Sequence, residues 1–524
     1  MTFVILIAIE ALLVYAACRR PTRTATVART AVFAVPLVFM FALRAYQALN
    51  TPGVLDWDES YYLSSAVTGA GGHGLYPYLV GYRPMPILGG YGYTVYLYAL
   101  AVLVAGPSLI VLRVLSLIGS VAGLCGIWRL VRIWYGSDAA WAATSLTATA
   151  SLFLLANTAR MDSWTFAAVA WALVVFAKSF RRWGERRPHL LAGLVFGLAL
   201  QVHPDVIVTA LACGVVYVVA WAATGFAARR WVMPLAPLLF LAGFLVGFAV
   251  FLVANVWVDP AAFYRTTLVV RADATAWYSA ETGSITDSFF APAILLAKER
   301  ARYAALSHVV SPFEVVIVVM GVAATYLRRS AVDRIMSILL PALVASTAVM
   351  LNNAAPVYYI HVLPALLVPL GPLFANGIRS GRFDGHMGPR QLLAFAFVAA
   401  GLCAIYDGRL IRSASAPSVD VASARLARSV RNVTDRRCKV VGDGGLYVEH
   451  FADYPYYISS RPTEVHYAML SYAIESESDY WSIKRPDAVI GPLSPALAVY
   501  VSANGFSERA STVWVRREGC VGGP

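Results

Sequence analysis

Long apolar segments recur along the first four-fifths of the chain, and short polar loops separate them. Most are long enough to cross a hydrocarbon core of roughly 30 Å as a helix. We count about twelve such segments, namely 3–17, 30–49, 108–131, 139–157, 163–180, 189–203, 205–225, 233–257, 304–327, 334–351, 358–377 and 390–407. The first lacks a basic start and Arg19 and Arg20 follow it, which favours a retained helix over a cleaved signal peptide. The pattern predicts an all-α polytopic membrane protein.

The basic residues indicate how these spans are oriented. They gather in six short loops, at 19–29, 129–132, 178–187, 229–230, 328–334 and 379–390. Counting spans places all six loops on one side, which the positive-inside rule makes cytoplasmic. A thirteenth apolar stretch, 91–106, would invert every later loop if it crossed, so we prefer an in-plane or re-entrant helix there.

The pattern changes after residue 410, where long apolar runs end. Short apolar runs at 439–442, 487–491 and 511–515 predict strands, and 465–475 predicts a helix. We therefore expect a transmembrane domain over 1–410, with its outer loop at about 51–107, and a small α/β domain over 411–524 on the outer side. Cys438 and Cys520 are the two cysteines of the second domain, and an oxidising compartment permits a bridge between them.

Composition agrees with a membrane protein and removes some other classes. The chain is 59% hydrophobic and 14% charged, too apolar for a soluble protein of 524 residues. The net charge of +13 lies in loops between spans, so it does not indicate nucleic-acid binding. The glycines at 442–445 lack the full dinucleotide-binding spacing, and the six cysteines lack metal-ligand spacing.

An acidic cluster stands just outside the second span. Asp56, Asp58 and Glu59 follow the apolar segment 30–49 after a short stretch, residues 50–55. Carboxylates at a membrane surface are costly unless they are solvated or used. An aspartate at the mouth of a helix bundle can accept a proton or orient a nucleophile.

Four motifs together resemble a known family. They are Asp58-Glu59 followed by tyrosines, Tyr82-Arg83-Pro84-Met85-Pro86, Arg160-Met161-Asp162, and the tyrosine-rich entry to a late span at 358–364. With the topology, they resemble the GT-C membrane glycosyltransferases over roughly residues 30–410. The most similar branch contains protein O-mannosyltransferases, lipid A aminoarabinose transferases and lipopolysaccharide-core galacturonosyltransferases.

The resemblance implies roles for the acidic residues. Asp58 matches the acidic residue of the family's first loop, which implies a general base or an orienter of the acceptor nucleophile. Glu59 is implied in positioning the acceptor, and Asp56 is either a helix cap or a support for Asp58. The alternative is that the acidic residues only hydrate an interfacial loop. Asp162 matches the acidic residue of the second loop, and otherwise it caps the helix that follows.

The resemblance also implies residues that contact the donor. Arg83 matches a basic residue near the lipid phosphate, although Met85 separates the two prolines here, and its alternative partner is a lipid headgroup. Four further residues have two alternatives: they line the donor cavity or contact its phosphate, or they are structural. They are His203, Arg271, Tyr359 and His361. The branch implies no metal and no cofactor beyond the donor itself.

These expectations define a function. We expect sugar transfer from a polyprenyl-phosphate donor, by inverting displacement, on the outer face of a bacterial inner membrane. The acceptor is left open between lipopolysaccharide core, lipid A, another envelope glycan and a secreted protein. Two rival functions are a transporter or flippase of lipid-linked sugars, which predicts internal repeats, and a non-catalytic envelope scaffold.

Overall fold

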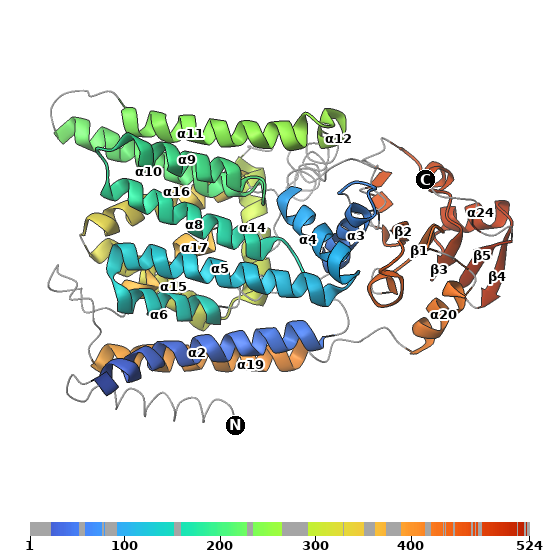
Figure 1. Ribbon diagram of the computed structural model, residues 1–524, viewed down its shortest axis with the longest axis horizontal. Coiled ribbons are helices and arrows are strands. Elements are labelled where there is room, and N and C mark those ends of the chain that lie inside the picture. Colours follow the sequence, from blue (N-terminus) through green and yellow to red (C-terminus); the bar gives the residue numbers. More distant parts are fainter. Residues whose placement is uncertain are drawn as a thin grey trace.

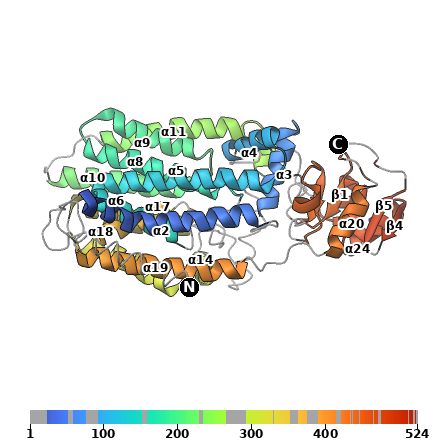
Figure 2. The same cartoon turned by 60° about the horizontal axis from the view of Figure 1, so that its bottom comes forward.

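The computed structural model describes residues 23–51, 58–75, 78, 92–150, 159–227, 234–264, 292–328, 330–350, 362–373, 389–413 and most of 421–520. Most of the chain before residue 413 forms a helical bundle whose long helices run along one axis (Figures 1 and 2). Its helices are α2 (Arg23–Asn50), α5 (Leu109–Tyr135), α6 (Ser137–Thr149), α8 (Asp162–Arg181), α9 (Arg186–Ala199), α10 (Val206–Ala227), α11 (Leu235–Phe251), α15 (Pro312–Leu327), α16 (Ala331–Met350) and α19 (Pro389–Ser413).

Six of the described helices are long and apolar enough to cross a membrane. They are Thr30–Asn50, Leu109–Tyr135, Asp162–Arg181, Val206–Phe226, Leu235–Val256 and Ala331–Met350. The protein is therefore a multi-pass membrane protein. Other predicted spans form shorter helices, including α6, α9, and the pair α17 (Leu363–Leu367) and α18 (Leu370–Leu373). The predicted segment 3–17 lies outside the described residues.

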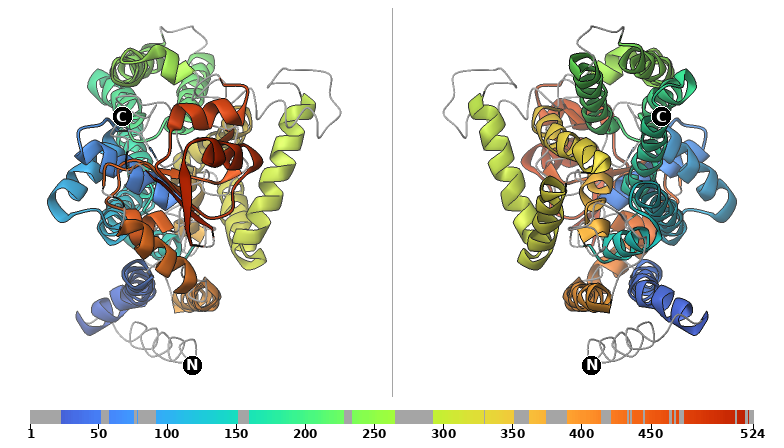
Figure 3. Two further views of the ribbon diagram at one scale, coloured as in Figure 1. Left: turned by 90° about the vertical axis from the view of Figure 1, so that its right-hand side faces the viewer. Right: turned by 90° about the vertical axis from the view of Figure 1, so that its left-hand side faces the viewer.

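The predicted span 304–327 is wrong as a single helix. The chain instead forms α14 (Pro292–Val309) and α15, which are sharply bent relative to each other. Ser311 caps α15: its hydroxyl accepts from the Glu314 backbone N–H, while the Glu314 carboxylate accepts from the Ser311 backbone N–H. This capping box, with Pro312 in the first turn, starts a new helix and ends the old one. Helix α14 lies across the bundle axis (Figures 1 and 3).

Two short helices occupy the end of the bundle from which the first outer loop was predicted to emerge. Helices α3 (Asp58–Ala70) and α4 (Gly92–Ala105) pack against each other beside the start of α5 (Figure 1). Helix α4 has 14 residues, which at about 1.5 Å per residue is too short to cross the bilayer. This geometry agrees with the in-plane alternative for segment 91–106.

The last part of the chain forms a small α/β domain next to α3 (Figure 1). Its elements are α20 (Val421–Arg431), β1 (Val440–Gly442), η6 (Tyr447–Phe451), β2 (Tyr457–Ser459), α23 (Glu477–Lys484), β3 (Ala488–Ile490), α24 (Pro495–Ala503), β4 (Phe506–Ala510) and β5 (Val513–Arg516). The sheet order is β2-β1-β3-β5-β4, with β1 parallel to β2 and β3, and β5 antiparallel to its neighbours. The three predicted strands are confirmed as β1, β3 and β5. The predicted helix 465–475 lies partly outside the described residues.

Covalent and packing contacts hold this domain. Cys438 and Cys520 form a disulfide with their Cα atoms 5.2 Å apart. Tyr447, Phe451 and Tyr457 share one apolar cluster with Tyr62 and Leu63 of α3. The domain therefore packs against the helix that carries Asp58. The basic α8–α9 loop lies at the opposite end of the bundle (Figure 1).

Candidate active site

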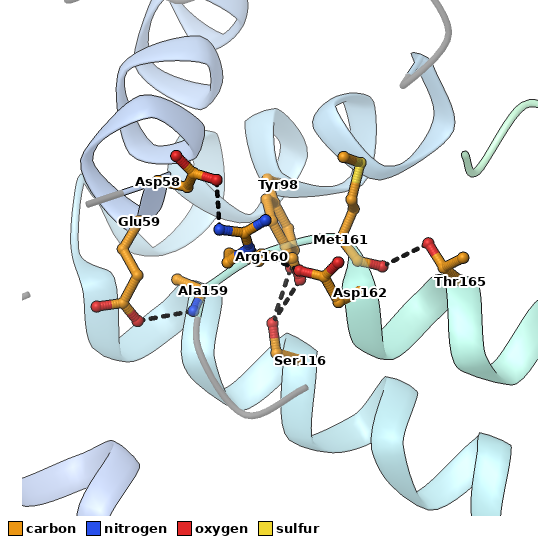
Figure 4. A network of polar contacts seen from close by, with 9 residues as sticks. All are labelled: Asp58, Glu59, Tyr98, Ser116, Ala159, Arg160, Met161, Asp162 and Thr165. Atoms are coloured by element: carbon orange, nitrogen blue, oxygen red, sulfur yellow. Dashed lines mark hydrogen bonds and ion pairs between the residues drawn. The ribbon is translucent and has the colours of Figure 1, made fainter. Parts of the chain in front are cut away.

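Asp58 is the first residue of α3 and retains access to solvent, with 40% of its side chain exposed. A helix N-terminus favours negative charge because its free backbone N–H groups carry partial positive charge. The guanidinium of Arg160 forms an ion pair with Oδ2 of Asp58 (Figure 4). The carboxylate is thus held in one orientation at the edge of the bundle.

Arg160 serves a second carboxylate at the same time. Its Nε donates to Oδ2 of Asp162 at 2.6 Å, and both side chains are buried. Asp162 begins α8, but the N-cap residue is Met161 and no side chain caps this helix end. Asp162 therefore does not act as the helix N-cap. It holds Arg160, which in turn holds the first loop (Figure 4).

The backbone of Arg160 is fixed from the other side. Its carbonyl oxygen accepts from the Tyr98 hydroxyl at 2.7 Å and from Oγ of Ser116 at 3.2 Å. Tyr98 comes from α4 and Ser116 from α5. Elements distant in the sequence thus converge on one residue, which gives Arg160 little freedom to move.

Glu59 points away from Asp58 into a separate buried network (Figure 4). Its carboxylate accepts two bonds from Arg113 of α5, at 2.8 Å and 2.6 Å, and one from the Ala159 backbone N–H at 2.7 Å. Arg113 also donates to the Thr51 carbonyl at 2.6 Å. Both Glu59 and Arg113 are fully buried. This pair therefore fastens α3 to α5, to the end of α2 and to the 159–162 segment.

His203 lies in the turn between α9 and α10, close to the same charges. It is buried, and its Nδ1 accepts from the Asp205 backbone N–H at 3.0 Å. Burial, followed by the positive charge of Arg160, lowers the pKa of His203 to about 3. The ring is therefore neutral and carries its proton on Nε2. The 3.6 Å approach of Nδ1 to the Asp205 carboxylate is consequently not an ion pair.

Asp205 extends the charge cluster toward α14. Burial, followed by the negative charge of Asp162, raises the pKa of Asp205 to about 7, and Arg302 acts in the opposite direction. Arg302 also forms an ion pair with Glu299. Lys298 of the same helix donates to the Ala348 carbonyl, and Lys298 and Arg302 are both fully buried. Helix α14 thus brings two buried cations to this end of the bundle.

The structure brings together four of the predicted residues: Asp58, Glu59, Asp162 and His203. Five others, Asp56, Arg83, Arg271, Tyr359 and His361, lie outside the described residues. Within the described part of the chain, no group of three or more His, Cys, Asp or Glu side chains could hold a metal ion.

Sequence reasoning missed several residues that build this site. Arg113 stands inside the apolar segment 108–131, and an ionisable residue at such a position is itself a signal of function or pairing. Arg160 belongs to the motif Arg160-Met161-Asp162, but the resemblance implies no role for it. Lys298 and Arg302 are spaced four residues apart, which places them on one helix face. Hydropathy does not reveal this pair, because most of α14 lies between the predicted spans 233–257 and 304–327.

Comparisons with solved structures give the fold. No family model matches the chain, and no curated protein matches it in sequence. The structure is similar to ArnT from Cupriavidus metallidurans, solved with undecaprenyl phosphate bound, with a TM-score of 0.57 and 14% identity, over 94% of this chain and 98% of that one. It is also similar to the Archaeoglobus fulgidus oligosaccharyltransferase tethered with an acceptor peptide, with a TM-score of 0.51 and 14% identity, over 92% of this chain and 74% of that one. The chain therefore has the GT-C fold of membrane glycosyltransferases.

Proposed function

We propose that the protein transfers a sugar from a polyprenyl-phosphate donor to an acceptor of the cell envelope. The observation that carries this proposal is the partly exposed carboxylate of Asp58, which Arg160 orients at the outer end of a GT-C bundle. The structurally similar ArnT contains bound undecaprenyl phosphate, and this supports a polyprenyl-phosphate donor here. The acceptors we consider are lipopolysaccharide core, lipid A, another envelope glycan and a secreted protein.

The reaction is a single in-line displacement. The acceptor hydroxyl or amine attacks the anomeric carbon while Asp58 accepts or orients its proton. The bond between the anomeric carbon and the phosphate oxygen breaks, and polyprenyl phosphate leaves with the electron pair. The anomeric configuration is inverted because the nucleophile enters opposite the leaving group.

The buried networks position the reacting carboxylate. Arg160 and Asp162 fix Asp58 from one side, and the Glu59–Arg113 pair fixes the backbone of α3. A group held in this way pays little reorganisation cost at the moment of reaction. Glu59 thus contributes to acceptor positioning through the loop.

Positive charge is needed where the phosphate leaves. We assign this role to Arg83 and Arg271. The buried Lys298 of α14 adds a further positive charge, whereas the charge of Arg302 is paired with Glu299. His203, neutral and protonated on Nε2, supplies a hydrogen-bond donor. Tyr359 and His361 are proposed to line the donor cavity, and Asp56 to support Asp58. We propose that no metal or cofactor is required.

The cellular location follows from charge and redox chemistry. We propose a bacterial inner membrane with the basic loops in the cytoplasm and the C-terminal domain in the periplasm. The basic α8–α9 loop at one end of the bundle and a disulfide in the domain at the other end support this orientation.

The deciding experiment is transfer by purified enzyme in neutral detergent with a defined polyprenyl-phosphate sugar. Asp58→Asn should lower turnover by about 10²–10⁴-fold, because a positioned base is lost. Glu508→Gln, which removes an exposed carboxylate from the C-terminal domain, is the matched control. Normal turnover by Asp58→Asn would contradict the role of Asp58. If the wild-type chain transfers no sugar in this assay, a transporter is favoured. Detergent removes the two compartments that transport needs, whereas glycosyl transfer does not need them.

The acceptor is identified separately. Mass spectrometry of envelope glycans from a deletion strain, beside its wild type, should show one glycan, lipid or protein that lacks a sugar.

A further inference from the structure

The end of the bundle opposite the C-terminal domain contains a cavity that the transfer site does not use. It has a volume of about 610 Å³ and lies between the last turns of α5 and α8 and the first turn of α9. Its walls carry the side chains of Arg129, Lys178, Arg181 and Arg182. The volume falls within the range of about 300–1,000 Å³ that is usual for small-molecule sites.

The charge of this cavity is not balanced by its own walls. None of the residues that line it is an aspartate or glutamate. Glu185 lies 3.7 Å from Arg182, and both side chains are largely exposed, so screening by solvent weakens that pair. Like charges gathered in one concave site raise the local potential and favour a bound anion.

Helix capping explains only part of this arrangement. Lys178 and Arg181 lie in the last turn of α8, where cations stabilise the helix C-terminus, and Arg181 donates to the Ile133 carbonyl. The basic residue in the last turn of α5 is Arg132, which stacks over Trp128. Arg129 lies one turn earlier and lines the cavity instead. Its position is therefore not explained by the end of α5.

The remaining walls of the cavity are apolar. Val175 and Leu191 line it, and about half of Leu191 is exposed on the bundle surface. Trp128 of α5 and Trp183, which follows the end of α8, pack against the core nearby, and tryptophan is enriched at the interface of a bilayer. The site thus combines four cations at the end of the bundle with an apolar wall that is partly exposed on the bundle surface.

We propose that this cavity binds the headgroup of an anionic phospholipid from the leaflet next to the basic loops. Phosphate oxygens accept paired hydrogen bonds from arginine guanidinium groups, and the acyl chains follow the apolar wall. The proposal does not depend on glycosyl transfer, because the cavity lies at the α8–α9 end of the bundle, whereas α3, which begins at Asp58, lies at the opposite end (Figure 1).

Native mass spectrometry tests the proposal on the full chain. The protein is released from nanodiscs that contain phosphatidylcholine and phosphatidylglycerol in equal amounts, and retained lipids are counted. Arg129→Gln combined with Lys178→Gln should reduce retained phosphatidylglycerol by at least about tenfold, since charge-assisted hydrogen bonds are lost. Arg132→Gln combined with Arg187→Gln removes the same charge from exposed residues outside the cavity. This control should retain the lipid as the wild type does. Equal losses in both double variants would overturn the proposal, as would no loss in either.

A second measurement needs no variant. The thermal unfolding midpoint of the wild-type chain is compared with short-chain phosphatidylglycerol, short-chain phosphatidylcholine or inorganic phosphate added. A larger increase with phosphatidylglycerol than with either other compound supports the site. An equal increase with inorganic phosphate would assign the cavity to free anions, and equal increases with both lipids would show that it does not select charge.

Discussion

Arg160 illustrates how one side chain sets the geometry of a reacting group. It forms ion pairs with Asp58 and Asp162, and α4 and α5 fix its backbone carbonyl. Lysine retains the charge but lacks the planar fork that reaches two carboxylates at once. The role of Arg160 therefore rests on shape as well as charge.

Arg160→Lys should lower kcat more than it raises KM. A misplacement of Asp58 by about 1 Å costs about 10²-fold in rate, whereas the donor is bound mainly by other residues. The measurement is steady-state transfer by purified enzyme, with Arg182→Lys, an exposed arginine at the far end of the bundle, as control. An unchanged kcat would show that Asp58 does not need this orientation.

Asp205 makes a testable contribution to the pH dependence of stability. Its pKa is raised to about 7 in the folded protein, from about 3.9 when unfolded. The folded state thus retains this proton over a range in which the unfolded state has lost it. The contribution of Asp205 to the free energy of unfolding is therefore fully present below about pH 4 and is lost as the pH rises to about 7.

Asp205→Asn removes this dependence. The thermal unfolding midpoint of the variant, relative to the wild type, should rise across that pH window and level off above it. Taking the difference between the two proteins cancels the opposite trend of His203, whose depressed pKa destabilises the folded state as the pH falls. A difference that stays constant with pH would contradict the raised pKa.

At the scale of elements, α9 and α11 approach closely through glycines. Gly193 and Gly197 of α9 face Gly243 and Gly247 of α11 with the spacing small-xxx-small, which lets two backbones approach in a membrane. A Cβ at residue 193 would lie 1.9 Å from the Phe240 carbonyl oxygen. The neighbouring atom is backbone, so it cannot move aside as a side chain would.

Gly193→Ala should therefore push the two helices apart. Overpacking of this kind costs about 1–3 kcal/mol or more. Gly214→Ala on α10 is the control, because its new Cβ would meet only Cε1 of Phe240 at 3.8 Å. Thermal unfolding in detergent should show a lower midpoint for Gly193→Ala alone. Equal midpoints for the two variants would place the close contact elsewhere.

The sequence predicted the helices better than it predicted the contacts between them. Hydrophobic length identifies α5, α8, α10 and α16, because a bilayer requires a minimum span. Hydrophobic length does not separate α14 from α15, because the capping box at Ser311 lies inside the apolar segment 304–327. The sequence motifs identify Asp58 but not Arg160 and Arg113, which hold the surrounding elements in place. Pairing between residues distant in the sequence leaves no local pattern.

The whole molecule has a basic end and an end that carries the disulfide-bonded domain. Arg187 and Ser502 are exposed residues of these two ends. In cells with an intact inner membrane, a membrane-impermeant thiol reagent should label Ser502→Cys but not Arg187→Cys, relative to the parent chain with its own cysteines. Permeabilised cells should label both. Labelling of Arg187→Cys alone would reverse the orientation and remove the argument for a lipid-linked donor.

The buried pair Glu59–Arg113 also has a consequence for how the protein is made. Synthesis proceeds from the N-terminus, so Glu59 emerges from the ribosome before α5 does. Arg113 enters the bilayer on α5 with a charge that hydrocarbon disfavours, and in the proposed orientation its partner Glu59 has by then reached the outer side. We therefore expect the loop that carries Glu59 and α5 to assemble together during insertion. In that case the surroundings of Asp58 form before the second half of the chain has been translated.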